Sequence, residues 1–175
     1  APIPEMYIPV EMEVEPIVLA IHKGKTLRGT AKGMLGSTSM QSIISIWRSF
    51  IRCRQRYDFE FWAATKWKIY DKETAQLVPF ILNRPQRSRL LPELETLRKA
   101  NRPIDIILLK ARQWGGSTLI DAYQSWIQQE WKKNWNSVIC ADIEDQSKIV
   151  LGMMDTAFSN YDVSDTGEEK PELRP

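Results

Sequence analysis

The sequence predicts an α/β fold in which a parallel sheet is built from strands that alternate with helices. The run 104–109 (IDIILL) is almost entirely apolar and has the length of a strand covered on both faces. A second apolar run at 138–141 follows a helical pattern over 118–131, and another helical pattern covers 146–158. Two strands alternating with two helices make a βαβα unit with a right-handed connection. We therefore expect an incomplete parallel-sheet core over residues 101–160.

The residues on either side of this core are expected to form further regions. Residues 1–37 hold four prolines and four glycines, which favour an extended basic arm with one short strand at 17–21. Residues 38–100 are expected to be mainly helical, and the last helix of this region is predicted over 85–100. The chain then ends in an acidic tail at 161–175.

Within the second region, the apolar spacing and the turn residues predict a helix followed by two strands. Ser37-Thr38-Ser39 offers a cap for a helix that runs through Arg56. The residues 67–70 and 77–82 each have strand length, and the polar turn 71–74 lies between them. Pro79 interrupts the second strand, which favours an edge position in the sheet.

Composition excludes several classes of protein. The chain has 175 residues, of which 43% are hydrophobic and 26% charged, as in a globular domain. No apolar run reaches the ~18 residues of a membrane helix, and no signal peptide opens the sequence. Two distant cysteines, Cys53 and Cys140, make neither a disulfide framework nor a zinc site, and a single histidine, His22, argues against a Ser-His-Asp triad. These features favour an intracellular setting.

The net charge of +2 conceals an uneven distribution along the chain. Residues 16–57 contain eight basic side chains and no acidic one, and a second basic cluster comprises Arg84, Arg87 and Arg89. Such a run either binds the phosphates of a nucleic acid or forms a solvated surface. The sequence leaves both interpretations open.

The segment between the first predicted core strand and the next helix carries the candidate chemistry. It reads KARQWGGST, residues 110–118, and stands where a phosphate-binding loop joins a strand to a helix N-terminus. With Gly115 placed on the second glycine of G-x-x-x-x-G-K-[ST], Ser117 takes the hydroxyl position that binds Mg²⁺. Gly116 then replaces the usual lysine, and Lys110 replaces the first glycine.

The missing lysine of this pattern is compensated within the loop. A loop that encircles phosphates brings its start close to its end, so Lys110 can reach the phosphates from the opposite side. Arg112 adds a planar cation suited to phosphate oxygens, and the N–H groups of residues 113–118 would surround them. Trp114 either packs beneath the loop or meets nucleotide or DNA. A plain Gly-Gly turn remains the alternative to a binding loop.

The tripeptide Gly24-Lys25-Thr26 also matches the end of the G-x-x-x-x-G-K-[ST] pattern. It is rejected as a phosphate-binding loop because its first-glycine position is Leu19, inside a predicted strand.

The segment LLKARQWGGSTL (108–119) resembles the ATPase core of large terminase subunits, the motors that package DNA into tailed bacteriophages. The upstream segment FILNRPQ is similar to the family's F-x-L-x-x-x-Q segment, and VICADIEDQSK (138–148) resembles its second core strand and following helix. The resemblance covers about residues 57–158 and implies a P-loop NTPase core of the ASCE-like type. It also implies that Gln86, the last residue of the upstream segment, contacts the adenine base.

The resemblance implies an ATPase with ATP and Mg²⁺ as cofactors, acting in the cytoplasm of an infected bacterial host. Its partners would be double-stranded viral DNA, the portal protein, the small terminase subunit and further copies in a ring, without a membrane. Lys110 and Arg112 are the expected catalytic residues, and Ser117 is the expected magnesium ligand. The expected nucleotide-binding residues are Gln86, Lys110, Ala111, Arg112, Gln113, Trp114, Gly115, Gly116, Ser117 and Thr118.

Two parts of such a motor are missing from the sequence. No hydrophobic strand ending in Asp-Glu follows the loop, and no nuclease carboxylates are present. The acidic group Asp142, Glu144 and Asp145 either binds a metal or begins a helix. We therefore expect the N-terminal part of a terminase ATPase, inactive by itself. The alternatives are another P-loop or helicase-like ATPase and a non-catalytic fragment that binds DNA or protein.

Overall fold

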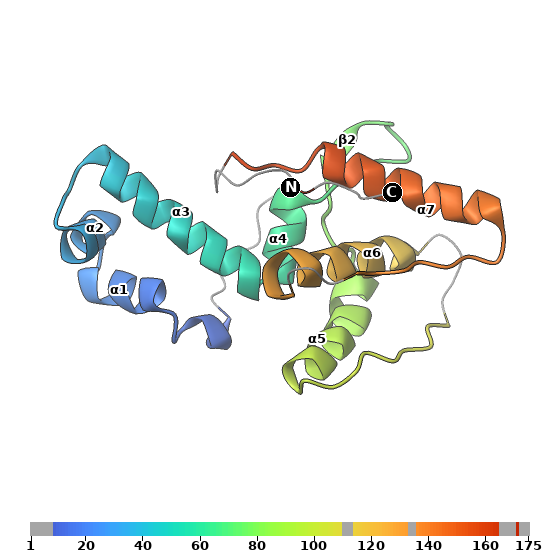
Figure 1. Cartoon of the computed structure of the whole chain (residues 1–175), viewed down its shortest axis with the longest axis horizontal. Helices are drawn as coiled ribbons and strands as arrows, with labels where there is room; N and C mark the ends of the chain where they lie inside the picture. Colours follow the sequence, from blue (N-terminus) through green and yellow to red (C-terminus); the bar gives the residue numbers. More distant parts are fainter. Residues whose placement is uncertain (1–8, 110–113, 133–135, 165–170, 172–175) are drawn as a thin grey trace.

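The chain folds into a helical lobe joined to a larger body, with one small sheet in that body (Figure 1). The computed structural model describes residues 9–109, 114–132, 136–164 and 171. The lobe contains a 3₁₀ turn, η1 (Val10–Met12), and the helices α1 (Pro16–Gly24), α2 (Leu27–Leu35) and α3 (Met40–Tyr57). The body follows it in sequence and comprises α4 (Phe59–Lys66), β1 (Lys68–Tyr70), β2 (Leu77–Pro79), η2 (Gln86–Leu90), α5 (Leu91–Lys99), α6 (Gly116–Trp126), η3 (Ile127–Trp131) and α7 (Glu144–Ser159).

The prediction of a parallel sheet is wrong. The described residues contain one sheet, the antiparallel pair β1–β2, in which Ile69 lies opposite Val78. Residues 104–109 and 138–141, expected as buried strands, belong to no sheet, and the side chains of Ile107 and Leu109 are fully exposed. Length and apolar character predicted burial for these runs, but a central strand also needs hydrogen-bonded neighbours on both edges, and the described residues supply none.

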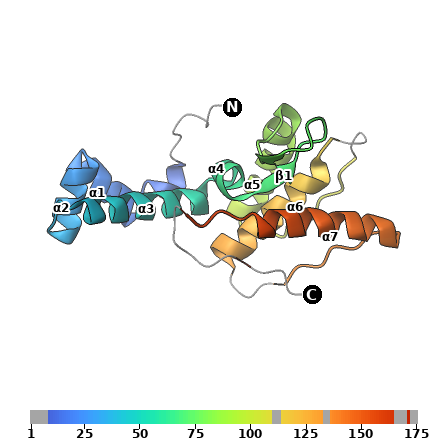
Figure 2. The same cartoon turned by 90° about the horizontal axis from the view of Figure 1, so that it is seen from above.

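The helices expected to flank that sheet pack on aromatic side chains instead. On α6, Tyr123 and Trp126 contact Phe59 of α4, with ring centroids 5.0 and 5.5 Å apart. From α7, Phe158 meets the edge of Trp67 at 5.7 Å, next to β1. The main core of the body therefore forms between helices and a hairpin (Figure 2).

The prediction of a strand at 17–21 is also wrong, because these residues lie in α1. Pro16 occupies the first turn of the helix, where its missing N–H costs nothing. Ile17 and Val18 are buried in a second core cluster with residues of α2 and α3, and Ile21 packs against that cluster. The arm expected to be extended is thus helical from Pro16 to Leu35, apart from a short turn at Lys25 and Thr26.

Glycines permit the close packing of α1 and α2. A Cβ atom on Gly29 would lie 2.3 Å from the backbone oxygen of Gly24, a distance that real side chains do not reach. Gly29 and Gly33 have low helix propensity, yet both lie inside α2. Tertiary contact outweighs the low helix propensity of glycine here.

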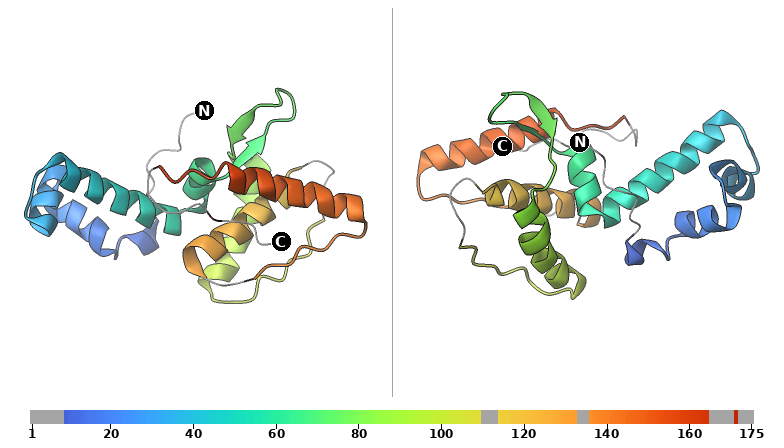
Figure 3. Two further views of the ribbon diagram at one scale, coloured as in Figure 1. Left: turned by 45° about the horizontal axis from the view of Figure 1, so that its top comes forward. Right: turned by 180° about the vertical axis from the view of Figure 1, so that it is seen from behind.

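The remaining helix predictions are confirmed. The helices predicted through Arg56, over 118–131 and over 146–158 correspond to α3, to α6 with η3, and to α7. The helix predicted over 85–100 corresponds to the continuous pair η2 and α5, in which η2 is a π-helical turn. The two short strands also form, as β1 and β2 (Figure 3).

The lobe and the body meet at Asp58. Its side chain accepts a hydrogen bond from the Phe61 N–H at 3.0 Å and so caps α4, while its backbone ends α3. Arg54, which is 3% exposed, forms an ion pair with Asp58 at 3.2 Å and lies 4.0 Å from the centre of the Phe61 ring. One carboxylate therefore fixes the junction between the two helices.

We predict opposite effects for alanine at two glycines of α2. Gly29→Ala should destabilise the fold by about 1–3 kcal/mol, because its methyl group would collide with the backbone of α1. Gly33→Ala should stabilise it by up to about 1 kcal/mol, because a Cβ there meets no atom within 4 Å. Chemical denaturation followed by circular dichroism measures both, and equal effects would contradict the close approach of α1 and α2.

Candidate phosphate-binding site

The described part of the predicted loop runs from Trp114 into the first turn of α6. Gly115 has a φ of 76°, in the left-handed region that favours glycine, and α6 begins at the next residue. Among the described residues, no side-chain hydrogen bond caps this helix, so its first-turn N–H groups lack a side-chain acceptor there. Ser117 is exposed in this turn and Thr118 is half-buried. Lys110, Ala111, Arg112 and Gln113 lie outside the described residues.

Two side chains bind the backbone at the end of the loop. One belongs to a residue just before η2 and the other to the first residue of η2. The Nε2 atom of Gln86 donates a hydrogen bond to the Gly115 carbonyl oxygen at 2.8 Å. The Nδ2 atom of Asn83 donates to the Trp114 carbonyl oxygen at 3.3 Å. These bonds join segments that are about 30 residues apart in sequence. We refer to Asn83 and Gln86 as the amide pair.

The amide pair is also bonded to itself. The Oε1 atom of Gln86 accepts from the Asn83 backbone N–H at 2.8 Å, and the Oδ1 atom of Asn83 accepts from the Gln86 N–H at 3.0 Å. Gln86 is 2% exposed, so the low dielectric around it strengthens these bonds and makes their loss costly. The turn 83–86 is thereby held in one shape.

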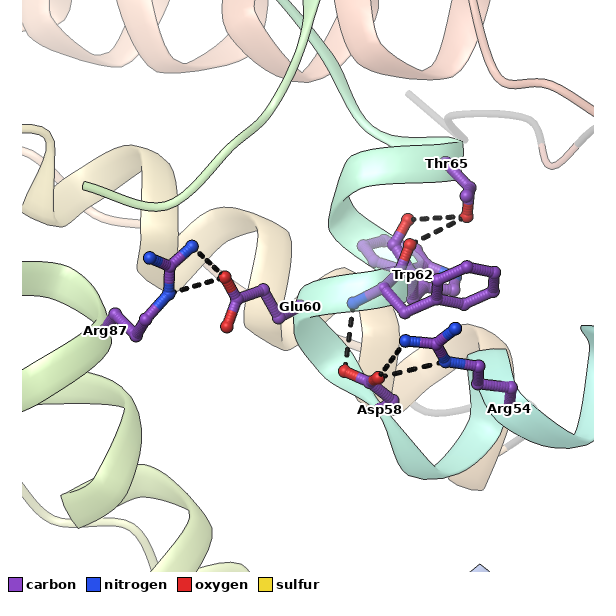
Figure 4. Close-up of polar contacts among 7 residues, drawn as sticks. Arg54, Asp58, Glu60, Trp62, Thr65 and Arg87 are labelled. Carbon is purple, nitrogen blue, oxygen red and sulfur yellow. Dashed lines mark hydrogen bonds and ion pairs between the residues drawn. The ribbon is translucent and has the colours of Figure 1, made fainter. Parts of the chain in front are cut away.

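An ion pair attaches η2 to helix α4 (Figure 4). The Nε atom of Arg87 lies 2.6 Å from Oε1 of Glu60, and a second guanidinium nitrogen contacts the same oxygen. Leu90, at the end of η2, is buried in the main core. The residue next to Gln86 is therefore anchored to α4, the helix on which α6 packs.

A cavity of about 730 Å³ opens beside Trp114. This volume falls within the range of small-ligand sites, which is about 300–1,000 Å³. Its walls are mostly apolar, with one cation and two carboxylates among them. The lining residues are Pro85, Arg89, Leu90, Glu93, residues 105–109 and Trp114.

The structure brings together some of the predicted site residues. Gln86 lies against Gly115, and Trp114 packs against the main core while facing the cavity. Both interpretations of Trp114 stay predictions. Contact between Gln86 and adenine stays a prediction, and both polar atoms of its amide are already bonded to backbone atoms.

Sequence reasoning missed two residues of this site. Asn83 lies in the upstream segment but was assigned no role. The signal was its position three residues before Gln86, a spacing at which side-chain amides close a turn. Arg89, which lines the cavity, was predicted only as part of a basic cluster. No sequence signal distinguishes it from Arg84 and Arg87.

The acidic group near α7 begins a helix, as one of its two interpretations proposed. Glu144 and Asp145 lie in the first turn of α7, where carboxylates interact favourably with the helix dipole. Glu144 also pairs with Lys148 at 2.8 Å. Among the described residues, no group of three His, Cys, Asp or Glu side chains is placed to hold a metal ion.

The site residue that suits Mg²⁺ is a single hydroxyl. Ser117 is exposed at the uncapped start of α6, so its oxygen is accessible to an ion that takes its other ligands from phosphates and water. The protein's share of such a site would be small, as is usual where magnesium arrives with a nucleotide.

Arg54 and Arg56, at the end of the basic run 16–57, have structural partners. Arg54 is buried with Asp58, and the guanidinium of Arg56 lies 4.9 Å from the ring centre of Trp131. Lys23, Arg28 and Lys32 are exposed on α1 and α2. The rejected tripeptide at 24–26 forms the turn between those helices, with Lys25 in the left-handed region.

Asp121 is a buried carboxylate on the helix that follows the loop. It is 5% exposed, and burial raises its pKa to about 6. Within the described part of the chain, its Oδ2 atom and the Ser125 hydroxyl, one turn later, have no hydrogen-bond partner. The charged form of Asp121 therefore opposes folding.

Comparison with known protein families, with curated proteins and with solved structures finds no match. Across the described residues, no helix combines the length and the apolar character that crossing a membrane requires.

We predict that Asp121 makes stability fall as the pH rises. Its folded pKa of about 6 exceeds its unfolded value of about 3.9. The stabilisation that the protonated carboxyl gives the folded state is therefore fully present below pH 4 and is lost as the pH rises through about 6. The loss is on the order of 2 kcal/mol. Asp121→Asn should remove this difference, as measured by urea denaturation from pH 4 to 7.

The exposed carboxylate of Asp142 provides the control for that experiment. Asp142→Asn should leave the pH profile of the wild-type protein unchanged. A profile for Asp121→Asn that parallels the wild type would contradict the burial of an unpaired carboxylate in α6.

Proposed function

We propose that the chain is the ATP-binding part of a terminase large subunit, the motor that moves viral DNA into a prohead. The proposal rests on the described end of the loop and on its contact with the turn 83–86. The observation that carries it is the contact between Gln86 and Gly115, because the two segments that the resemblance assigns to one nucleotide site lie side by side.

The start of α6 supports phosphate binding at this place. The first-turn N–H groups and the helix dipole both favour an anion, and no side chain in the described part of the chain caps these donors. Gly115 has no side chain to obstruct an approaching phosphate. Lys110 and Arg112 would supply the cations, each charge-assisted bond being worth about 1.5–3 kcal/mol.

The adjoining cavity supports the binding of the rest of a nucleotide. It begins at Trp114, within the loop, and has room for a sugar and a base. Its lining carries one cation, Arg89, and two carboxylates, Glu93 and Asp105. Mg²⁺, when bound with the phosphates at Ser117, would neutralise part of their charge.

The reaction of the full motor would be attack by water on the γ-phosphate, in line with the leaving oxygen. In this chain the residues 110–118 would hold and orient the triphosphate. The residue that positions water is absent from the sequence, so we propose binding with very slow turnover. Double-stranded DNA, the portal protein and the small terminase subunit are the proposed partners of the motor, which would act as a ring in the host cytoplasm.

We predict that Lys110→Ala weakens the binding of Mg²⁺-ATP by about 10- to 100-fold, since it removes one charge-assisted contact. Isothermal titration calorimetry of the whole chain measures this affinity. Lys25→Ala is the matched control, because it removes a lysine from the rejected glycine-lysine-threonine segment and should leave the affinity unchanged.

Three results would oppose the proposed function. They are an absence of ATP binding by the wild-type chain, equal losses for the two lysine variants, and salt-sensitive DNA binding that does not respond to ATP. The last would favour the non-catalytic alternative.

A further inference from the structure

The hydrogen bonds of Gln86 suggest a role other than contact with a base. A side-chain amide recognises adenine by offering one donor and one acceptor to the edge of the ring. In Gln86 the acceptor is bonded to the Asn83 N–H and a donor to the Gly115 carbonyl oxygen, and the residue is 2% exposed. An incoming base would have to break both bonds and displace the turn 83–86.

Those same bonds act directly on the loop. The carbonyl of Gly115 belongs to the residue that precedes α6, and it also accepts the first helical hydrogen bond, from the Leu119 N–H at 3.2 Å. Asn83 holds the preceding carbonyl, that of Trp114. Two consecutive peptide groups at the end of the loop are therefore oriented by the amide pair, and this orientation sets the direction of the next N–H groups.

Gly115 and Gln86 are also matched in shape. A Cβ at position 115 would lie 2.8 Å from the Nε2 atom of Gln86, and the left-handed φ of 76° is unfavourable for other residues. The absence of a side chain at 115 thus lets the amide approach the backbone closely. The conformation of Gly115 and the bonds of Gln86 therefore both fix the position of the loop end.

We propose that Asn83 and Gln86 are positioning residues that fix the end of the phosphate-binding loop, residues 114–118, and that Gln86 does not select the base. This inference rests on the proposed function. It implies that the site takes nucleoside triphosphates through their phosphates, so that ATP and GTP bind with similar affinity.

The first test compares three probes: Mg²⁺-ATP, Mg²⁺-GTP and Mg²⁺-tripolyphosphate, which has no base. Gln86→Ala should weaken all three by the same factor, about tenfold for the loss of two buried hydrogen bonds. The ratio of ATP to GTP affinity should stay as in the wild type. A loss confined to ATP would overturn the inference, because it would show that Gln86 contacts adenine.

Two further variants separate positioning from general destabilisation. Gln76→Ala alters an exposed glutamine of the β1–β2 hairpin and should change none of the three affinities. Asn83→Ala removes an exposed side chain, so the fold should persist while all three affinities fall together, by less than for Gln86→Ala. Unchanged affinities in Asn83→Ala together with Gln86→Ala would overturn the inference.

The second test needs no ligand and therefore separates this inference from the proposed function. Hydrogen exchange of the Leu119 amide, which donates to the Gly115 carbonyl oxygen, should accelerate about tenfold in Gln86→Ala and stay unchanged in Gln76→Ala. If no nucleotide binds the wild type but this acceleration occurs, the proposed function fails and the positioning role stands. Unchanged exchange in Gln86→Ala would overturn the positioning role whatever the affinities show.

Discussion

Aromatic packing on helix α4 holds the rest of the structure in place. Phe59 contacts the rings of Tyr123 and Trp126 on α6, and Trp62 contacts Trp67 at the start of the hairpin. The indole N–H of Trp126 donates to the backbone oxygen of Gln55 at 2.8 Å, which connects α6 to the end of α3. Each contact buries a large apolar surface, so α4 fixes both the lobe and the body.

The candidate site depends on the same helix. α6 packs on α4 through its aromatic face, while η2 is attached to α4 through the ion pair of Arg87 with Glu60. Because both elements are positioned by one helix, Gln86 of η2 reaches Gly115 at the start of α6. The geometry of the loop therefore follows from packing some distance away from it.

The helices of the chain were largely predictable, and the sheet was not. The spacing of Leu119, Tyr123 and Trp126 identified α6 correctly, because helical periodicity is a local property. The partner of this apolar face is set by residues distant in sequence, and the face can pack on a helix as well as on a sheet. The same limit applies to α1, where Ile17, Val18 and Ile21 fit a strand by composition but pack on one core cluster from a helix.

The site was predictable in its parts more than in its bonding. The motif at 110–118 and Gln86 were assigned to one site, and Gly115 of the motif is in contact with Gln86. The bond from the Gln86 amide to the loop depends on the left-handed conformation of Gly115, which no spacing rule specifies. The burial of Asp121 was likewise invisible, because a carboxylate on an amphipathic helix is ordinarily exposed.

The most direct test of the central claim is the response of individual amides to a polyphosphate. Titration of ¹⁵N-labelled protein with Mg²⁺-tripolyphosphate should shift the N–H resonances of Gly116, Ser117 and Thr118 far more than those of the equally helical first turn of α7. Shifts of equal size at the two helices, or none at the start of α6, would contradict the account of a phosphate-binding loop.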